Sequence, residues 1–334
     1  MANNGCIHFQ NSYLSHAAAT VGKHENEGPL RTWFDAHESD EYFGKSTFEQ
    51  AESELVRRNL ALLMQKASIK EDEVGVILGG DLVNQCTGTS FGINGSEVPF
   101  LGLYGACSTI AEGLLVGSAL VDGGFLPNAI AVASSHFCTA ERQYRFPPEY
   151  GSQRPPTAQN TVTGAGAFLI TSTPTDIRVA DGVIGKIVDG GITDANNMGA
   201  AMAPAAADTI LRYFDHSGKT LSDFDAVVTG DLGSEGSELT DELLQKCGLD
   251  ISKKHLDCGV LIYDAEKQDM HAGGSGCGCL ASVLGSYFFD KLQSGAYKRI
   301  LAVGTGALLS ASTPLQKLSI PAVAHAVCIE ACEV

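Results

Sequence analysis

Two short motifs occur twice in the chain, in the same order, and this repeat limits the possible folds more than any other feature of the sequence. An apolar strand that ends in a Gly-Asp turn is expected at 73–82 and again at 224–232. Further on, a glycine and a cysteine open an apolar stretch at Cys107 and again at Cys277. A strand follows each stretch, so each copy has the order strand, turn, helix, strand. Such alternation predicts an α/β protein built from two similar halves.

The apolar stretches of the two copies predict helices that are buried on every side. Residues 109–121 are nearly apolar all round, and residues 281–289 come close to this. A helix without a polar face has to be covered by protein on all its faces. We therefore expect a central layer of two helices between two sheets, with one half formed by residues 1–175 and the other by 176–334.

Outer layers are predicted by amphipathic segments that precede the first strand of each half. In residues 47–66 the leucines share one face, and Glu52 lies outside it. The counterpart in the second half is 205–214. Residues 147–163 contain four prolines and predict an extended excursion over the surface.

Composition excludes several classes of function. The formal net charge of −17 argues against a nucleic-acid partner, because binding nucleic acid begins with neutralising phosphates. No apolar run reaches the roughly 20 residues that span a bilayer, and residues 1–10 lack the features of a signal peptide. The ten cysteines form no CxxC pair, so we expect reduced thiols in a cytoplasmic protein and no metal site.

Cys107 is the strongest candidate for chemistry. It lies between a strand that ends near Tyr104 and a helix expected to begin at Thr109, with Thr109 and Glu112 at the spacing of a capping box. A thiol just before a helix amino terminus lies at the positive end of the helix dipole, which lowers its pKa and prepares a nucleophile. The alternative is a small buried residue in a tight turn, and spacing alone leaves both open.

Several long strings in both halves indicate a family. GACS at 105–108 resembles the segment in which enzymes of the thiolase superfamily carry their acyl-accepting cysteine, and TGAGA at 163–167 resembles the glycine-rich strand that closes their first half. Within that superfamily the chain is most similar to the stage V sporulation AD (SpoVAD) family. The strings that carry this similarity lie at 104–125, 133–155, 198–210, 271–279 and 304–310. The resemblance implies a duplicated five-layer αβαβα fold with two buried central helices.

The resemblance also implies a function. A SpoVAD-like chain would bind dipicolinate (pyridine-2,6-dicarboxylate) in the SpoVA channel assembly, acting in its uptake during sporulation and its release during germination. It would have no resident cofactor, and calcium would enter only as the chelate of dipicolinate. Its partners would be the other SpoVA proteins at the spore inner membrane, which it would join peripherally from the forespore cytoplasm. It would also form a homodimer.

One departure from the condensing enzymes bears on catalysis. Those enzymes need a second-half histidine, with a partner His, Asn or Cys, to stabilise the charge that develops on the thioester. Where the resemblance places that histidine the chain has TGD at 229–231, and the next turn has GGS at 273–275; His271 is the nearest substitute. We expect a retained pocket with impaired or lost condensing chemistry. The alternatives are an active acyltransferase that uses Cys107, and a scaffold subunit whose pocket is vestigial.

A pocket for a flat dianion needs hydrogen-bond donors and positive charge. His136 ends a first-half strand, and Arg142 and Arg145 follow it. Arginine holds a carboxylate in a bidentate fork, although both arginines could instead pair with neighbouring carboxylates. Helix amino termini at Cys107 and Ser275 would add backbone donors. Beside Cys107 at the nucleophile position, the predicted ligand-binding residues are His136, Arg142, Arg145, Asp81, Asn84, Ser134, His271 and Ser275.

Overall fold

The strands of the two halves form sheets with the same strand order. The computed structural model describes residues 5–144, 151 and 153–332. The first-half sheet has the order β5 (Phe100–Gly102), β4 (Ile77–Gly80), β6 (Asn128–Ser135), β8 (Gly164–Thr171), β2 (Tyr13–Val21). The second-half sheet has the order β11 (His255–Asp257), β10 (Ala226–Thr229), β13 (Arg299–Ala307), β14 (Ala322–Ala331), β9 (Ile177–Val183).

Strand directions repeat as well as strand order. In the first half β4 is parallel to β5 and β6, whereas β8 is antiparallel to β6 and β2. In the second half β10 is parallel to β11 and β13, whereas β14 is antiparallel to β13 and β9. The two sheets meet edge to edge through the pair Tyr13–Arg178 of β2 and β9. The internal repeat predicted from the sequence is therefore present in the topology.

Three further short strands bind the halves together or extend a sheet. β1 (Cys6–His8) belongs to the first half by sequence but pairs with β9 of the second, and β3 (Ala36–His37) extends the first sheet beside β2. β7 (Asn160–Thr161) and β12 (Gly274–Ser275) form a two-residue parallel ladder between the halves.

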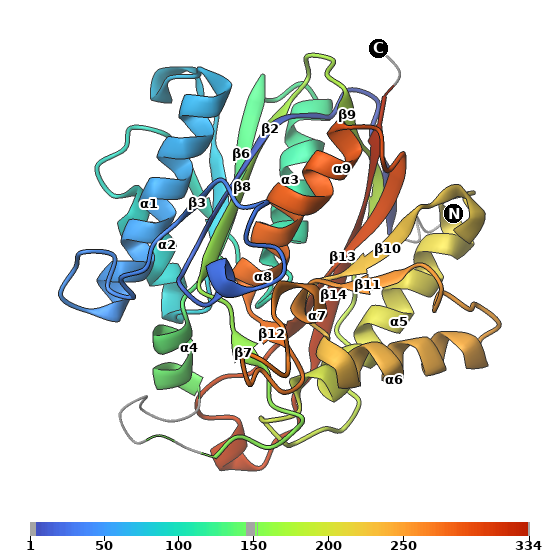
Figure 1. The fold of residues 1–334 in the computed structure, drawn as a ribbon. Coiled ribbons are helices and arrows are strands. Elements are labelled where there is room, and N and C mark those ends of the chain that lie inside the picture. Colours follow the sequence, from blue (N-terminus) through green and yellow to red (C-terminus); the bar gives the residue numbers. More distant parts are fainter. Residues whose placement is uncertain (1–4, 145–150, 152, 333–334) are drawn as a thin grey trace.

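Two buried helical segments lie between the sheets, as expected. α3 (Thr109–Asp122) is the first, and the second runs through α8 (Cys277–Val283), a π-helical turn (Leu284–Phe288) and α9 (Phe289–Gln293). Figure 1 shows α3, α8 and α9 in the middle of the molecule with one sheet on either side. Every residue of α8 is buried, because sheets and helices cover all its faces.

Outer helices complete the five layers. α1 (Phe48–Ala67) and α2 (Thr87–Ile93) cover the first sheet, and α5 (Met198–His216) and α6 (Gly233–Lys246) cover the second (Figure 1). α1 begins where the sequence predicted, since the Thr47 side chain accepts a hydrogen bond from the Gln50 N–H. The shorter helices α4 (Phe137–Tyr144) and α7 (Cys258–Ile262) lie at the end of the molecule where the central helices begin. The predicted αβαβα fold is confirmed.

Glycine lets the central layer approach the first sheet closely. A Cβ atom at Gly166 of β8 would lie 1.9 Å from the backbone oxygen of Ala281 in α8, a distance that no real contact reaches. The glycine-rich start of β8 is therefore a requirement of helix-on-sheet packing.

Two expectations about exposure are wrong. Glu52 of α1 is fully buried, because Thr139 and Ser134 donate hydrogen bonds to its carboxylate at 2.6 and 3.3 Å. Residues 158–162, in the predicted surface excursion, are also buried, since they run beside β12 and the backbone N–H groups of Asn160 and Val162 donate to the second half. Residues 147–150 and 152 of that excursion lie outside the described residues. Within the described ranges, no helix combines the length and the apolar character needed to cross a bilayer.

Candidate functional site

Cys107 lies in a tight turn between β5 and α3. The preceding residue, Ala106, has a φ of 49°, in the left-handed region that few side chains adopt. Strand β13 of the second half passes directly beneath this turn, where a Cβ atom at Gly306 would lie 2.2 Å from the Gly105 oxygen. The turn is thus held against the other half, and Cys107 is 7% exposed.

The predicted capping box at the start of α3 is wrong. Thr109 is the first helical residue, and its hydroxyl donates to the Ala106 oxygen at 2.6 Å while it accepts from the Gly105 N–H at 3.2 Å. The Oε2 atom of Glu112 is buried with no hydrogen-bond partner among the described residues. The threonine closes the turn before the helix because the left-handed residue brings the Ala106 oxygen within its reach.

Of the two alternatives left open for Cys107, the structure favours the small buried residue in a tight turn, because its pKa is shifted away from activation. Burial raises the pKa of the thiol well above its usual range, and the negative charge of Asp231 raises it further. The Asp231 carboxyl group and the thiol lie close enough for each to shift the pKa of the other. Cys107 is therefore a protonated thiol at neutral pH, and the thiolate is the form that attacks thioesters.

Asp231 is the site residue that the sequence analysis missed. It follows β10, is 1% exposed, and accepts hydrogen bonds from the Gly276 N–H at 2.8 Å and the Thr305 hydroxyl at 2.7 Å. Burial raises the pKa of Asp231 to about 7, against the opposing effect of the hydrogen bonds from Gly276, Cys107 and Thr305. The Gly-Asp motif that ends both strands was a signal for it, but only Asp81 of the two was selected.

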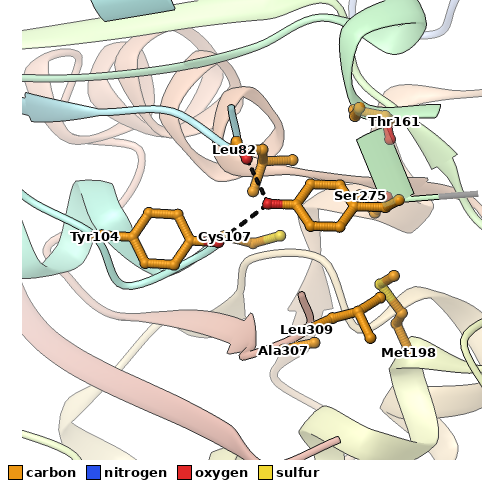
Figure 2. A pocket seen from close by; sticks show the side chains of 10 residues that line it. Leu82, Tyr104, Cys107, Thr161, Met198, Ser275, Ala307 and Leu309 are labelled. Carbon is orange, nitrogen blue, oxygen red and sulfur yellow. Dashed lines mark hydrogen bonds between the residues drawn. The ribbon is translucent and has the colours of Figure 1, made fainter. Parts of the chain in front are cut away.

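A small cavity borders the Cys107 thiol (Figure 2). Its volume is about 30 Å³, which is room for a water molecule or two. It is lined by side chains of both halves, and in the described part of the chain none of the lining side chains carries a charge at neutral pH: Leu82, Tyr104, Cys107, Ala140, Tyr144, Thr161, Met198, Ser275, Ala307 and Leu309. The cavity is thus a mainly apolar chamber with a few hydroxyl groups and one thiol.

Two tyrosines of the first half close one side of the cavity. The Tyr144 hydroxyl donates to the Leu82 oxygen at 2.5 Å and lies 3.2 Å from the Tyr104 hydroxyl, as the dashed lines of Figure 2 mark. Tyr144 ends α4, and burial raises its pKa, so it is a neutral donor. At about 30 Å³ the cavity is too small for a larger ligand, so binding one requires the lining side chains, these tyrosines among them, to move.

Of the predicted ligand-binding residues, the structure brings Ser275 to this cavity beside Cys107. His136 lies outside it, packed against the rings of Phe43 and Phe48, with its Nε2 2.8 Å from the Glu41 oxygen. Burial lowers the pKa of His136, so it is a neutral imidazole that donates to that oxygen. The expectation that His136 and Cys107 line one pocket is not met.

The predicted basic residues are also away from the cavity lining. Arg142 pairs with Glu49 at 3.1 Å, and its guanidinium lies over the ring of Phe48. His271 lies 3.4 Å from a carboxylate oxygen of Asp269. Arg145 lies outside the described residues.

The remaining predicted residues belong to the first half alone. Asp81 accepts hydrogen bonds from the backbone and hydroxyl of Thr89 at 2.7 and 2.6 Å. Ser134 donates to Glu52, and Asn84 is exposed. Across the described ranges, no group of three or more His, Cys, Asp or Glu side chains is arranged to hold a metal ion.

Nearly the whole chain matches one known protein family. A family model described as Stage V sporulation protein AD (SpoVAD) matches residues 4–330. Stage V sporulation protein AD of Bacillus subtilis strain 168 is 43% identical over 318 residues, which cover 95% of this chain and 94% of that protein.

Solved structures with the same fold are thiolase-like synthases. OleA of Xanthomonas campestris aligns with a TM-score of 0.62 at 13% identity, covering 97% of this chain and 99% of its own. 3-Oxoacyl-[acyl-carrier-protein] synthase III of Aquifex aeolicus VF5 aligns with a TM-score of 0.58 at 11% identity, covering 96% and 99%. At these identities the likeness concerns the fold.

Proposed function

The chain belongs to the stage V sporulation protein AD family, and from this premise we propose that it binds dipicolinate in the cavity at Cys107. In this proposal it acts as the dipicolinate-binding component of the SpoVA channel assembly, in uptake during sporulation and in release during germination. It does not condense acyl groups.

The burial of Cys107 next to the acidic side chain of Asp231 is the observation that carries the choice of binding over acyl transfer. Acyl transfer needs a thiolate and hydrogen-bond donors for the developing oxyanion. Here a carboxyl group occupies the strand end at which the thiolase resemblance places a histidine, and its charge opposes ionisation of the thiol. His271, the nearest substitute, is outside the cavity lining. The cavity is retained while the groups that would activate Cys107 are replaced.

The uncharged lining favours one form of the ligand. Free dipicolinate is a dianion at neutral pH, and the chain as a whole has a formal net charge of −17. Among the described side chains that line the cavity none is cationic, and a dianion there would lose its hydration without compensation from them. Calcium carries two positive charges and prefers oxygen ligands, so its one-to-one chelate with dipicolinate is neutral. We propose this chelate as the form that binds most tightly, with calcium held by the ligand and water.

Membership of the family also leads us to propose partners for this chain. The chain would reach the spore inner membrane through the other SpoVA proteins. It would also form a homodimer, for which β5 offers a surface. β5 is the last strand of its sheet in the described part of the chain, and its Leu101 side chain is 49% exposed. An uncovered apolar edge strand is a pairing surface, and a two-fold axis would set β5 against β5 of a second copy.

Calorimetric titration of the purified protein with equimolar calcium and dipicolinate tests the binding site. Leu309 lines the cavity, so Leu309→Trp should fill it and weaken binding at least tenfold. Leu315 is 85% exposed and outside the lining, so Leu315→Trp is the matched control and should bind as the parent does.

Two outcomes would contradict the proposal. Unchanged affinity in a folded Leu309→Trp variant would place the ligand elsewhere on the molecule. Absence of binding by the parent, together with binding of acetyl-CoA in a parallel titration, would favour the acyltransferase alternative.

A further inference from the structure

Asp231 lies directly behind the wall of the cavity. It accepts a hydrogen bond from the N–H of Gly276, which follows Ser275, at 2.8 Å, and its charge acts on the thiol of Cys107. Cys107 and Ser275 both line the cavity, whereas Asp231 does not. A charge on Asp231 therefore acts on any ligand across one layer of side chains.

No cationic side chain is found among the described groups that interact with the Asp231 carboxyl group. Thr305 of β13 and Gln159 are neutral, and Gln159 donates to the Asp231 backbone oxygen at 2.7 Å. The titratable groups that interact with it from the α3 turn, α8, β11 and α7 are all acids or thiols: Cys107, Cys277, Cys279, Asp257 and Cys258. His255 lies beyond Asp257 and is paired with Asp241 at 2.8 Å.

We propose that Asp231 selects the charge state of the ligand, admitting the neutral calcium chelate at any pH and the free dianion only when Asp231 is protonated. The inference rests on the proposed function, because it assumes that the cavity at Cys107 is the dipicolinate site. It adds a positioning residue that acts through Cys107 and Gly276 without touching the ligand.

Electrostatics gives the direction of the effect. Two like charges separated by one layer of buried side chains repel each other strongly, because the medium between them screens little. Since burial raises the pKa of Asp231 to about 7, both protonation states are populated near neutral pH. Binding of the free dianion stabilises protonated Asp231 and takes up a proton. By linkage, its affinity falls by up to about tenfold per pH unit above pH 7, whereas the affinity of the neutral chelate stays level.

Titrations at pH 6, 7 and 8 test this selection. Each would use dipicolinate in calcium-free buffer and, separately, dipicolinate with equimolar calcium. In the parent we expect the affinity for the free dianion to fall steeply with pH and the affinity for the chelate to stay level. Asp231→Asn removes the ionisable group, so this variant should bind the free dianion equally well at all three pH values.

Glu25→Gln provides the matched control. Glu25 is also a fully buried carboxyl group whose pKa burial raises, but its oxygens bond to Tyr263 and Thr163 and it is outside the cavity lining. This variant should keep the steep profile of the parent. If Asp231→Asn fails to fold, proton uptake by the parent, measured by calorimetry in two buffers of different ionisation enthalpy, gives the same information. We expect binding of the free dianion to take up as much as one proton, and binding of the chelate to take up none.

The outcomes separate this inference from the proposed function. The chelate could bind while the affinity for the free dianion is independent of pH in the parent, or depends steeply on pH in Asp231→Asn. In either case the role of Asp231 is overturned and the proposed function stands. If neither form binds at any pH, both are overturned.

Discussion

The two halves share one fold, yet the buried aspartates that follow their equivalent strands have different partners. Asp81 follows β4 directly, and its carboxylate accepts hydrogen bonds from Thr89 of the same half. Asp231 lies two residues past β10, and it contacts the central layer, where its partners include the thiol of Cys107 from the opposite half. The inward-facing residues Leu78 of β4 and Val228 of β10 align at the same offset as the two aspartates, so equivalent positions have acquired different partners. Small differences between repeated halves can thus build a site that neither half contains alone.

Packing of the central layer gives the largest expected difference between the halves. Gly166 of β8 faces α8 in the central layer, whereas Ala326 of β14 packs in a cluster with residues of α5 on the outer face of its sheet. Because a Cβ at Gly166 would collide with the backbone of α8, Gly166→Ala should lower the free energy of unfolding by about 3 kcal/mol or prevent folding. In the second half, Ala326→Gly should cost only about 1 kcal/mol. Urea unfolding of both variants measures the two values, and equal losses would show that the central layer tolerates an added methyl group at Gly166.

Reactivity of Cys107 gives the next largest effect. Because the charge of Asp231 raises the pKa of this thiol, Asp231→Asn should increase the thiolate fraction and speed alkylation of Cys107 by iodoacetamide about tenfold. Asp81→Asn is the matched variant of the other half and should leave the rate at Cys107 unchanged. Rates come from peptide mass spectrometry of timed samples. A faster reaction in both variants would mean that loosening of the fold, rather than charge, exposes the thiol.

The hydrogen-bonded pair Tyr104 and Tyr144, which closes one side of the cavity, gives the smallest effect. Both tyrosines belong to the first half. The described second-half side chains that line the cavity, such as Met198 and Leu309, form no such pair. Tyr144→Phe removes the hydrogen bond to Leu82 and should lower the free energy of unfolding by about 1 kcal/mol while speeding association of the chelate. Tyr42→Phe, at a tyrosine outside the cavity lining, should change neither quantity. Slower association in Tyr144→Phe would mean that this hydroxyl guides the ligand instead of excluding it.

The architecture could be predicted from sequence because it depends on patterns that local residues carry. The repeated motifs predicted the succession of strand, turn, helix and strand along each half, and the segment 109–121 was nearly apolar all round because most of α3 is buried, although Ala119 is exposed. The exposure of Glu52 could not be predicted in this way. A carboxylate on an outer helix predicts exposure, and its burial depends on donors from residues 134 and 139, which lie far away in the sequence.

The candidate site was harder to predict because its chemistry depends on contacts between the halves. Cys107 could be selected from the turn and helix that follow it, but the direction of its pKa shift is set by burial and by Asp231, more than a hundred residues away. His136 was selected as a donor at a strand end, yet Phe43 and Phe48 enclose it. Sequence spacing identifies the end of the sheet at which a ligand would bind and leaves open which side chains reach it.

The account depends most directly on the claim that Cys107 forms a cavity wall and does not accept acyl groups. Intact-mass spectrometry of the protein after incubation with acetyl-CoA at pH 7 tests this claim. Because burial and the charge of Asp231 raise the pKa of the Cys107 thiol, we expect an unchanged mass in the parent and in Cys107→Ser. A stoichiometric acetyl adduct on the parent that is absent from Cys107→Ser would contradict the account and identify the chain as an active acyltransferase.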